Sequence, residues 1–184
     1  MTWIIPGTTL EANRTDADNI EAIFRSMFLP GGMVLSQVAS ITGLEAYTVQ
    51  NWVKRGFLSP PRDKRYSMRQ LCRIINIRML KGVLSMEQIC GLLGYINGQL
   101  DDESDDLIDD SQLSFMFVRL ASRSSKRDSR DQWEASIQEV LKDYQEPAPG
   151  AKERITTVLR IMLTAWCAAR MRQEAERMLS EISL

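Results

Sequence analysis

The chain has 184 residues, of which 44% are hydrophobic and 26% charged, as in a folded protein with room for one or two small domains. Its net charge of −1 gives no indication of nucleic-acid binding for the chain as a whole. Three widely spaced Cys residues and the absence of His argue against a disulfide framework and against a thiolate or imidazole metal cluster.

We expect a cytoplasmic protein with no membrane segment. The first residues lack the basic and apolar regions of a secretory signal. The most apolar stretch, Val158–Ala169, is interrupted by Arg160 and is too short to span a bilayer.

The N-terminal part, residues 1–32, is predicted to be an arm followed by one helix. Residues 1–13 are expected to be extended or irregular. Asp16–Phe28 has the apolar spacing of an amphipathic helix and is followed by the helix-breaking sequence Pro30-Gly31-Gly32. We expect this helix to pack on the region that follows or on the C-terminal region.

Two short helices are predicted next, Ser36–Ile41 and a second one that ends at Lys54 or Arg55. They are joined by a tight turn at Gly43, which is the helix-turn-helix layout. In the second helix, the spacing turns Ala46, Val49 and Val53 inward with Trp52 beside them. Side chains that can read base edges or phosphates are left outside: Tyr47, Thr48, Gln50, Asn51, Lys54 and Arg55.

A compact β-wing is predicted after this second helix. Gly56 ends the helix, and Pro60-Pro61 favours an extended path. A short basic loop follows, closed by an aromatic residue, and its candidate DNA-binding residues are Arg62, Lys64, Arg65 and Tyr66.

Two capping boxes, Ser67 with Gln70 and Ser85 with Gln88, predict helices Ser67–Lys81 and Ser85–Leu93. Their inward stripes are Leu71, Ile74, Ile75 and Met79 in the first, and Met86, Ile89, Cys90 and Leu93 in the second. We expect Cys72 and Cys90 to be small core residues.

Taken in order, these motifs resemble the MerR-type winged helix-turn-helix regulators. The resemblance runs from Ser36 to Leu93, about a third of the chain, and rests on Gly56-Phe57-Leu58, Pro60-Pro61, Lys64-Arg65-Tyr66-Ser67 and the two capped helices. It implies double-stranded DNA as partner. The chain departs from the family at Tyr47, Gln50, Asn51-Trp52, Val53 and Lys64, so the base preference is not carried over.

The chain also resembles a bacterial family of uncharacterised proteins, a domain of unknown function, that combines such a head with two further motifs. Here these motifs are Tyr95-Ile96-Asn97-Gly98 and the acidic run Asp101–Asp106. This second resemblance implies no established activity.

Charge is distributed unevenly. Residues 36–82 carry a net charge of +7, whereas residues 83–112 contain eight acidic and no basic residues. The acidic run within the stretch from Gly94 to Asp110 has three interpretations: a solvated loop, a divalent-metal site, or an electrostatic mask for the basic head. A calcium loop starting at Asp101 would place Asp106 where Gly is required, so the metal pattern fails.

The C-terminal part is predicted to contain three helices: residues 111–122, Asp131–Tyr144, and a long one from Ala151 to Ile182. The long helix has a broad apolar face centred on Trp166, and Met178, Leu179 and Ile182 resume it. Such a face favours a helical bundle. It also provides spare apolar surface for a homodimer.

We therefore expect a mainly α protein that functions as a DNA-binding transcriptional regulator. Four segments are predicted: an N-terminal arm and helix (1–32), a MerR-like winged helix-turn-helix head with a small β-wing (33–98), an acidic connector (99–112), and a C-terminal helical module for dimerisation or an unidentified effector (113–184). The alternative is a protein-interaction adaptor, or an excisionase-like accessory factor, on the same scaffold. An enzyme has little support, because the only candidate catalytic group is the carboxylate cluster at 101–110. We predict no catalytic residue, no cofactor and no metal.

Overall fold

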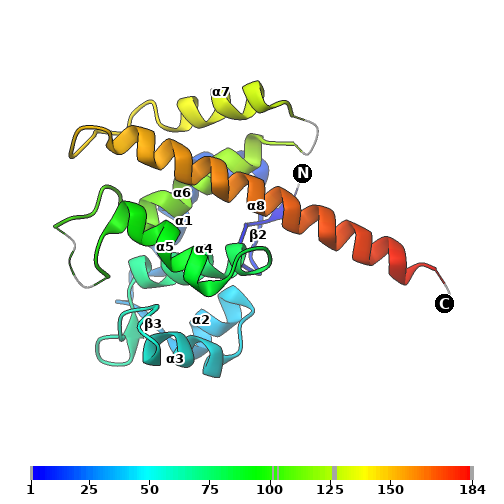
Figure 1. Cartoon of the computed structure of the whole chain (residues 1–184). Helices are drawn as coiled ribbons and strands as arrows, with labels where there is room; N and C mark the ends of the chain where they lie inside the picture. Colours follow the sequence, from blue (N-terminus) through cyan, green and yellow to red (C-terminus); the bar gives the residue numbers. More distant parts are fainter. Residues whose placement is uncertain (1, 101, 103, 126–127, 183–184) are drawn as a thin grey trace.

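The structure is a computed structural model that describes residues 2–100, 102, 104–125 and 128–182. It is mainly helical, with two small antiparallel sheets that pair β1 with β2 and β3 with β4 (Figure 1). In chain order the elements are β1 (Thr2–Ile4), β2 (Glu11–Asn13), the 3-10 helix η1 (Arg14–Asn19), α1 (Ile20–Met27), β3 (Met33–Val34), α2 (Leu35–Thr42), α3 (Ala46–Lys54), β4 (Arg65–Tyr66), α4 (Met68–Lys81), α5 (Met86–Asn97), α6 (Asp110–Arg123), α7 (Arg130–Val140) and α8 (Ala151–Ser180).

Helices α4 and α6 form the centre of the molecule. They pack against each other, and α6 also contacts α1, α7 and α8. Figure 1 shows α2 and α3 at one end of the molecule and α7 at the other, with α4 and α6 between them. Every residue of α4 from Leu71 to Ile77 is buried. A single hydrophobic core runs from Ile5 to Cys167, so the segments around α4 and α6 are held together by shared burial.

Local capping explains where several helices begin. Ser67 Oγ accepts a hydrogen bond from the Gln70 amide, while Gln70 Oε1 accepts one from the Ser67 amide. Ser85 and Gln88 repeat this arrangement at α5. The two predicted capping boxes are therefore confirmed, and so is the burial of the first predicted stripe, Leu71 to Met79.

Helix α5 is longer than the sequence predicts. It continues through Gly94 and ends at Asn97, with the turn at Gly98. Ile96 and Asn97 are buried, so their packing offsets the low helix propensity of Gly94. The predicted end of this helix at Leu93 is therefore four residues too early.

Two further expectations about helices are corrected by tertiary packing. Ala46 is exposed, because α3 turns Val49 and Trp52 into the core. The helix predicted at Asp16–Phe28 begins as the 3-10 helix η1 and becomes α-helical only at Ile20.

The N-terminal arm is a hairpin that is fixed to the head. The Thr9 amide and hydroxyl both donate to Ile41 O at the end of α2, and Arg78 Nη1 of α4 donates to Thr8 O. Gly7 lies in the left-handed region, and a Cβ there would lie 2.5 Å from Ile75 O, so glycine permits this close approach.

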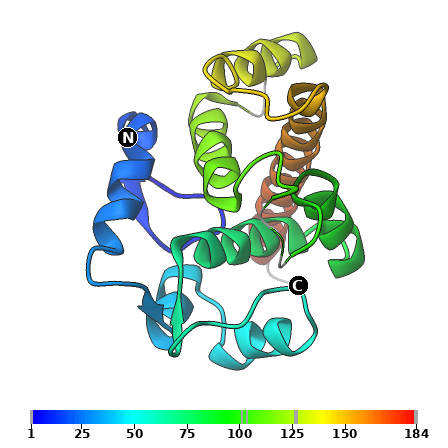
Figure 2. The same ribbon diagram turned by 90° about the vertical axis from the view of Figure 1, so that its left-hand side faces the viewer.

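Helix α8 has a buried half and an exposed half. Its first part contributes Ile155, Leu159, Met162 and Trp166 to the core. Every residue from 171 to 182 is exposed, and Figure 1 shows this end (red) extending away from the body. In Figure 2 the same end lies behind the rest of the chain and is seen foreshortened. The apolar face predicted to resume at Met178 thus has no partner within the described part of the chain. None of the described helices is long and apolar enough to span a bilayer.

Candidate nucleic-acid interface

The orientation of α3 is set by the turn at Gly43. This residue ends α2 in the left-handed conformation (φ 62°, ψ 21°), and Glu45 then begins α3 from an extended conformation. Val38 and Ile41 of α2 are buried, as are Val49 and Trp52 of α3. These contacts leave the opposite face of α3 facing solvent.

The outward face of α3 carries most of the predicted contact residues. Tyr47 is 70% exposed, and Thr48 is half-buried. The exposed residues also include Gln50, Asn51, Lys54 and Arg55. Arg55 also makes a cation–π contact, with its guanidinium 4.6 Å from the centre of the Phe57 ring.

The basic loop after α3 is a tight two-residue turn. Asp63 and Lys64 both have positive φ (48° and 59°), and the Arg65 amide donates to Arg62 O at 2.8 Å. The returning strand β4 pairs with β3, which lies just before α2, with Val34 opposite Arg65. Arg62, Lys64 and Arg65 are exposed, so the turn presents three cations beside α3.

Tyr66 was predicted to lie on the surface with these cations, and this prediction is wrong. It is only 3% exposed, because β4 pairs it with Met33 and turns its ring toward the core. This burial raises the pKa of the Tyr66 hydroxyl. The Tyr66 ring therefore lies on the core side of β4. Sequence spacing alone does not reveal that this side chain points inward.

An apolar groove of about 720 Å³ separates α3 from the turn. Its apolar lining consists of Val34, Leu35, Val53, Pro61 and Tyr66. Polar and cationic side chains complete the lining, namely Ser36, Gln50, Lys54 and Lys64. Four of the ten predicted contact residues therefore line this groove: Gln50, Lys54, Lys64 and Tyr66.

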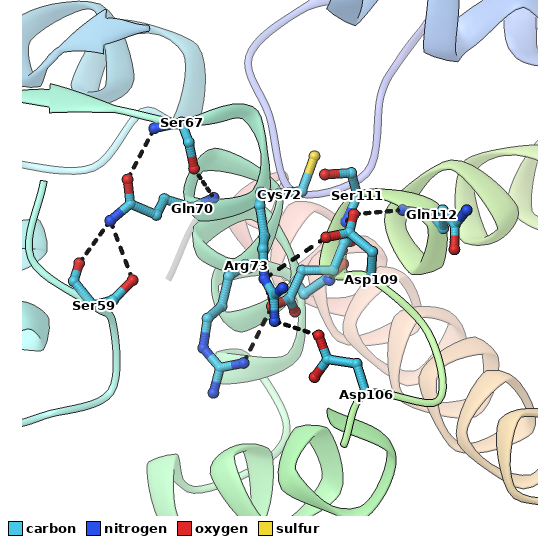
Figure 3. A network of polar contacts seen from close by, with 12 residues as sticks. Ser59, Ser67, Gln70, Cys72, Arg73, Asp106, Asp109, Ser111 and Gln112 are labelled. Atoms are coloured by element: carbon cyan, nitrogen blue, oxygen red, sulfur yellow. Dashed lines mark hydrogen bonds and ion pairs between the residues drawn. The ribbon is translucent and has the colours of Figure 1, made fainter. Parts of the chain in front are cut away.

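A network of ion pairs joins the head to the acidic connector (Figure 3). On α4, Arg69 Nη2 lies 2.6 Å from Asp106 Oδ2, and Arg73 Nη1 lies 3.3 Å from Asp110 Oδ2. Arg73 Nε also donates to Phe57 O at 3.0 Å, so this arginine connects α6 to the exit of α3. Asp109 Oδ1 accepts from the amide of Ser111 and caps α6.

Burial perturbs the carboxyl groups of this network. Asp110 is 1% exposed, and desolvation raises its pKa against the opposing effect of Arg73 and Arg69. Desolvation likewise raises the pKa of Asp106 to about 6, although Arg69 lowers it. Burial also raises the pKa of the nearby Cys72 thiol to about 12, which makes this thiol unreactive at neutral pH.

The solvated-loop interpretation of the connector is therefore wrong for Asp106 and Asp110. Both side chains are buried against cations of the head. Asp101 and Glu103 lie outside the described residues. Arg69 and Arg73 were not singled out from the sequence, because their partners lie 37 residues away and no local pattern links them. Among the described residues, no group of three or more His, Cys, Asp or Glu is arranged to hold a metal ion.

Residues 32–113 match the model of a family described as a domain of unknown function (DUF1836). This span begins just before β3 and ends within α6, so it contains the basic turn, α3 and the Arg69–Asp106 network. The resemblance to an uncharacterised family, noted from Tyr95–Gly98 and the acidic run, is confirmed to this extent.

The chain is also similar to the "Uncharacterized protein YkrK" of Bacillus subtilis (strain 168). The two are 26% identical over 116 residues, which cover 61% of this chain and 50% of that relative. The chain thus spans about half the length of the curated relative that it matches. No solved structure matches the chain. Neither description names an activity, a ligand or a partner.

Proposed function

We propose that the protein is a DNA-binding transcriptional regulator whose head, residues 33–98, is a MerR-like winged helix-turn-helix. The observation that carries the proposal is the combination of an exposed polar face on α3 with three exposed cations on the adjacent turn. In this arrangement α3 enters the major groove of duplex DNA, and the turn contacts the backbone beside it.

The side chains divide into two roles. Gln50 and Asn51 have the amide groups that pair with adenine edges, and Tyr47 and Thr48 lie on the same helix. Lys54 and Arg55 at the end of α3 bind phosphates, as do Arg62, Lys64 and Arg65 on the turn.

Anisotropy titrations with a labelled duplex pool, at about 50 to 300 mM salt, test this proposal. We expect affinity to fall steeply with salt. Replacing Lys54 and Lys64 together by Ala should lower the slope of log affinity against log salt by about 2, since each phosphate contact accounts for about 1. Lys142→Ala is the matched control and should leave the slope unchanged, because Lys142 follows α7, which lies at the opposite end of the molecule from α3 (Figure 1).

Absence of binding at low salt, or binding that is insensitive to salt, would refute the proposal. If the chain binds DNA, selecting the bound sequences from the same pool identifies the operator.

The apolar groove between α3 and the turn favours a second candidate function. Its exposed surface is mostly apolar, and a protein segment fits such a surface better than a phosphate backbone does. In this case the head is a protein-interaction adaptor or an excisionase-like accessory factor. Binding of a partner protein that persists at high salt, with no DNA affinity, would support it.

We further propose that two copies associate through the exposed half of α8. The exposed small and apolar residues at 168, 171, 175, 178 and 182 follow the three-and-four spacing of a coiled-coil seam. An isolated helical end of this length is marginally stable in water, so a partner helix would stabilise it. Trp166 has a different role, because its ring packs at 6.2 Å against Phe117 within the same chain.

A further inference from the structure

A second groove lies on the side of α6 that faces α1 and the segment after α7. Its volume is about 680 Å³. The floor is formed by successive turns of α6, with Gln112, Met116 and Arg119, and one end is closed by Leu107 and Ile108 of the connector. The wall after α7 contributes Val140, Tyr144 and Pro147.

The guanidinium of Arg119 on α6 differs from the other cations of this groove. The other cations that line it are paired: Arg123 with Asp18 at 2.7 Å, and Lys142 with Glu139 at 3.5 Å. Arg119 differs, because within the described ranges its guanidinium has no hydrogen bond or ion pair and its Nε is buried. A half-buried guanidinium without an acceptor is unfavourable, and a carboxylate is the acceptor that matches its planar donors.

The surroundings of Arg119 define what else a ligand needs. Met116, Val140 and Tyr144 provide apolar surface at the same groove, with Met116 and Tyr144 only half-buried. Tyr144 is held in place, since its hydroxyl donates to Leu107 O at 2.6 Å. Six acidic residues also line the groove, and five of them lie within 4 Å of a cation: Asp18, Glu21, Asp106, Asp109 and Glu139. The sixth, Asp143, repels a second negative charge, so a single carboxylate is favoured over a dicarboxylate.

We propose that this groove is a binding site for a small monocarboxylate with an apolar body. The carboxylate accepts hydrogen bonds from Arg119, and the body lies against Met116, Val140 and Tyr144. The site is separate from the α3 face, and its occupancy does not depend on whether the head binds DNA.

Calorimetric titration of the full chain with 3-phenylpropionate tests the site. The uncharged 3-phenylpropanamide, of the same shape, serves as the control ligand. We expect saturable one-to-one binding of the acid, with a Kd on the order of 1 mM or tighter, and at least tenfold weaker binding of the amide. Arg119→Gln should weaken binding of the acid at least tenfold, whereas Arg130→Gln, an exposed arginine outside the groove, should not.

Thermal unfolding of both variants shows whether they are folded, and Arg119→Gln should melt no lower than the wild type because it removes an unpaired charge. Three outcomes would overturn the proposal. These are no saturable binding of the acid up to about 10 mM, equal binding of acid and amide, or unchanged binding by Arg119→Gln.

Discussion

At the scale of single residues, Arg73 and Asp110 form a deeply buried ion pair. Its side chains are 9% and 1% exposed. Removing one partner of a buried pair leaves an uncompensated charge, and this costs more than the pair itself contributes. Arg73 belongs to α4 and Asp110 to α6, so the ion pair helps to hold these two central helices against each other.

We predict that Asp110→Ala lowers the free energy of unfolding by about 3 kcal/mol. Urea denaturation of the full chain measures this change. Asp131→Ala, at an exposed position in the first turn of α7, should change stability by only about 0.5 kcal/mol. A loss below about 1 kcal/mol for Asp110→Ala would show that water screens the pair. The double replacement with Arg73→Met should cost less than the two single losses together.

Asp106 gives a prediction about pH. Its pKa in the folded protein is about 6, against an ordinary value of 3.8, so the folded state holds its proton more tightly than the unfolded state. The stability from this proton is fully present below about pH 4 and is lost as the pH rises through about 6. The wild type should therefore lose stability relative to Asp106→Asn over this range.

Urea midpoints of both proteins at several pH values between 4 and 7 provide the measurement. Carbon-13 NMR of the carboxyl groups should show the Asp106 resonance titrating near pH 6. A stability difference that is independent of pH, or that changes in the opposite direction, would contradict the raised pKa.

At the scale of elements, the turn between α2 and α3 determines which face of α3 is exposed. Gly43 has a φ of 62°, and a Cβ there would lie 2.9 Å from Thr9 Cγ2 of the N-terminal arm. Both the backbone conformation and the space therefore require glycine. The arm and the turn support each other, because the Thr9 hydroxyl donates to Ser40 O near the end of α2.

We predict that Gly43→Ala lowers the free energy of unfolding by about 1–2 kcal/mol. Gly91→Ala is the matched control, because Gly91 lies within α5 with nothing near its missing Cβ. That change should stabilise the protein by about 0.5–1 kcal/mol, as expected for alanine in a helix. Equal effects of the two substitutions in chemical denaturation would contradict the structural role assigned to Gly43.

At the scale of the whole molecule, two surfaces remain without a partner within the described chain: the α3 face with its basic turn, and the exposed half of α8. Helix-turn-helix regulators commonly read two half-sites as a dimer. In the proposed function, the α3 face would bind DNA and the exposed half of α8 would join two copies. The ion pairs of Arg177 with Glu174 and Glu181 stabilise the projecting helix itself and leave its apolar seam open.

We predict a homodimer at tens of micromolar, measured by light scattering. Replacing Met171 and Met178, both more than half exposed, by Glu should give a monomer with an unchanged helical spectrum in the body. Gln173→Glu, on the other side of the same helix, should leave the dimer intact. A monomeric mass for the unaltered chain would refute association through α8 and leave the head to bind DNA as a single unit.

Local patterns in the sequence determined most of the secondary structure. A capping box acts within four residues, so Ser67-Gln70 and Ser85-Gln88 located two helix starts correctly. The apolar spacing of α4 and of the first half of α8 likewise identified buried residues. The exposed residues of α3 and of the basic turn were also found in this way, with the exceptions of Thr48, which is half-buried, and Tyr66, which is buried.

Only the tertiary structure decided which residues meet across the chain. The burial of Tyr66 depends on β3, and the length of α5 depends on the packing of Ile96. The pairing of Arg69 and Arg73 with the connector depends on how α6 lies between α4 and α7. So does the absence of a partner for Arg119 Nε among the residues that the structure describes. Such contacts are set by the packing of whole helices, and their partners lie too far apart in sequence for any periodicity or capping pattern to specify them.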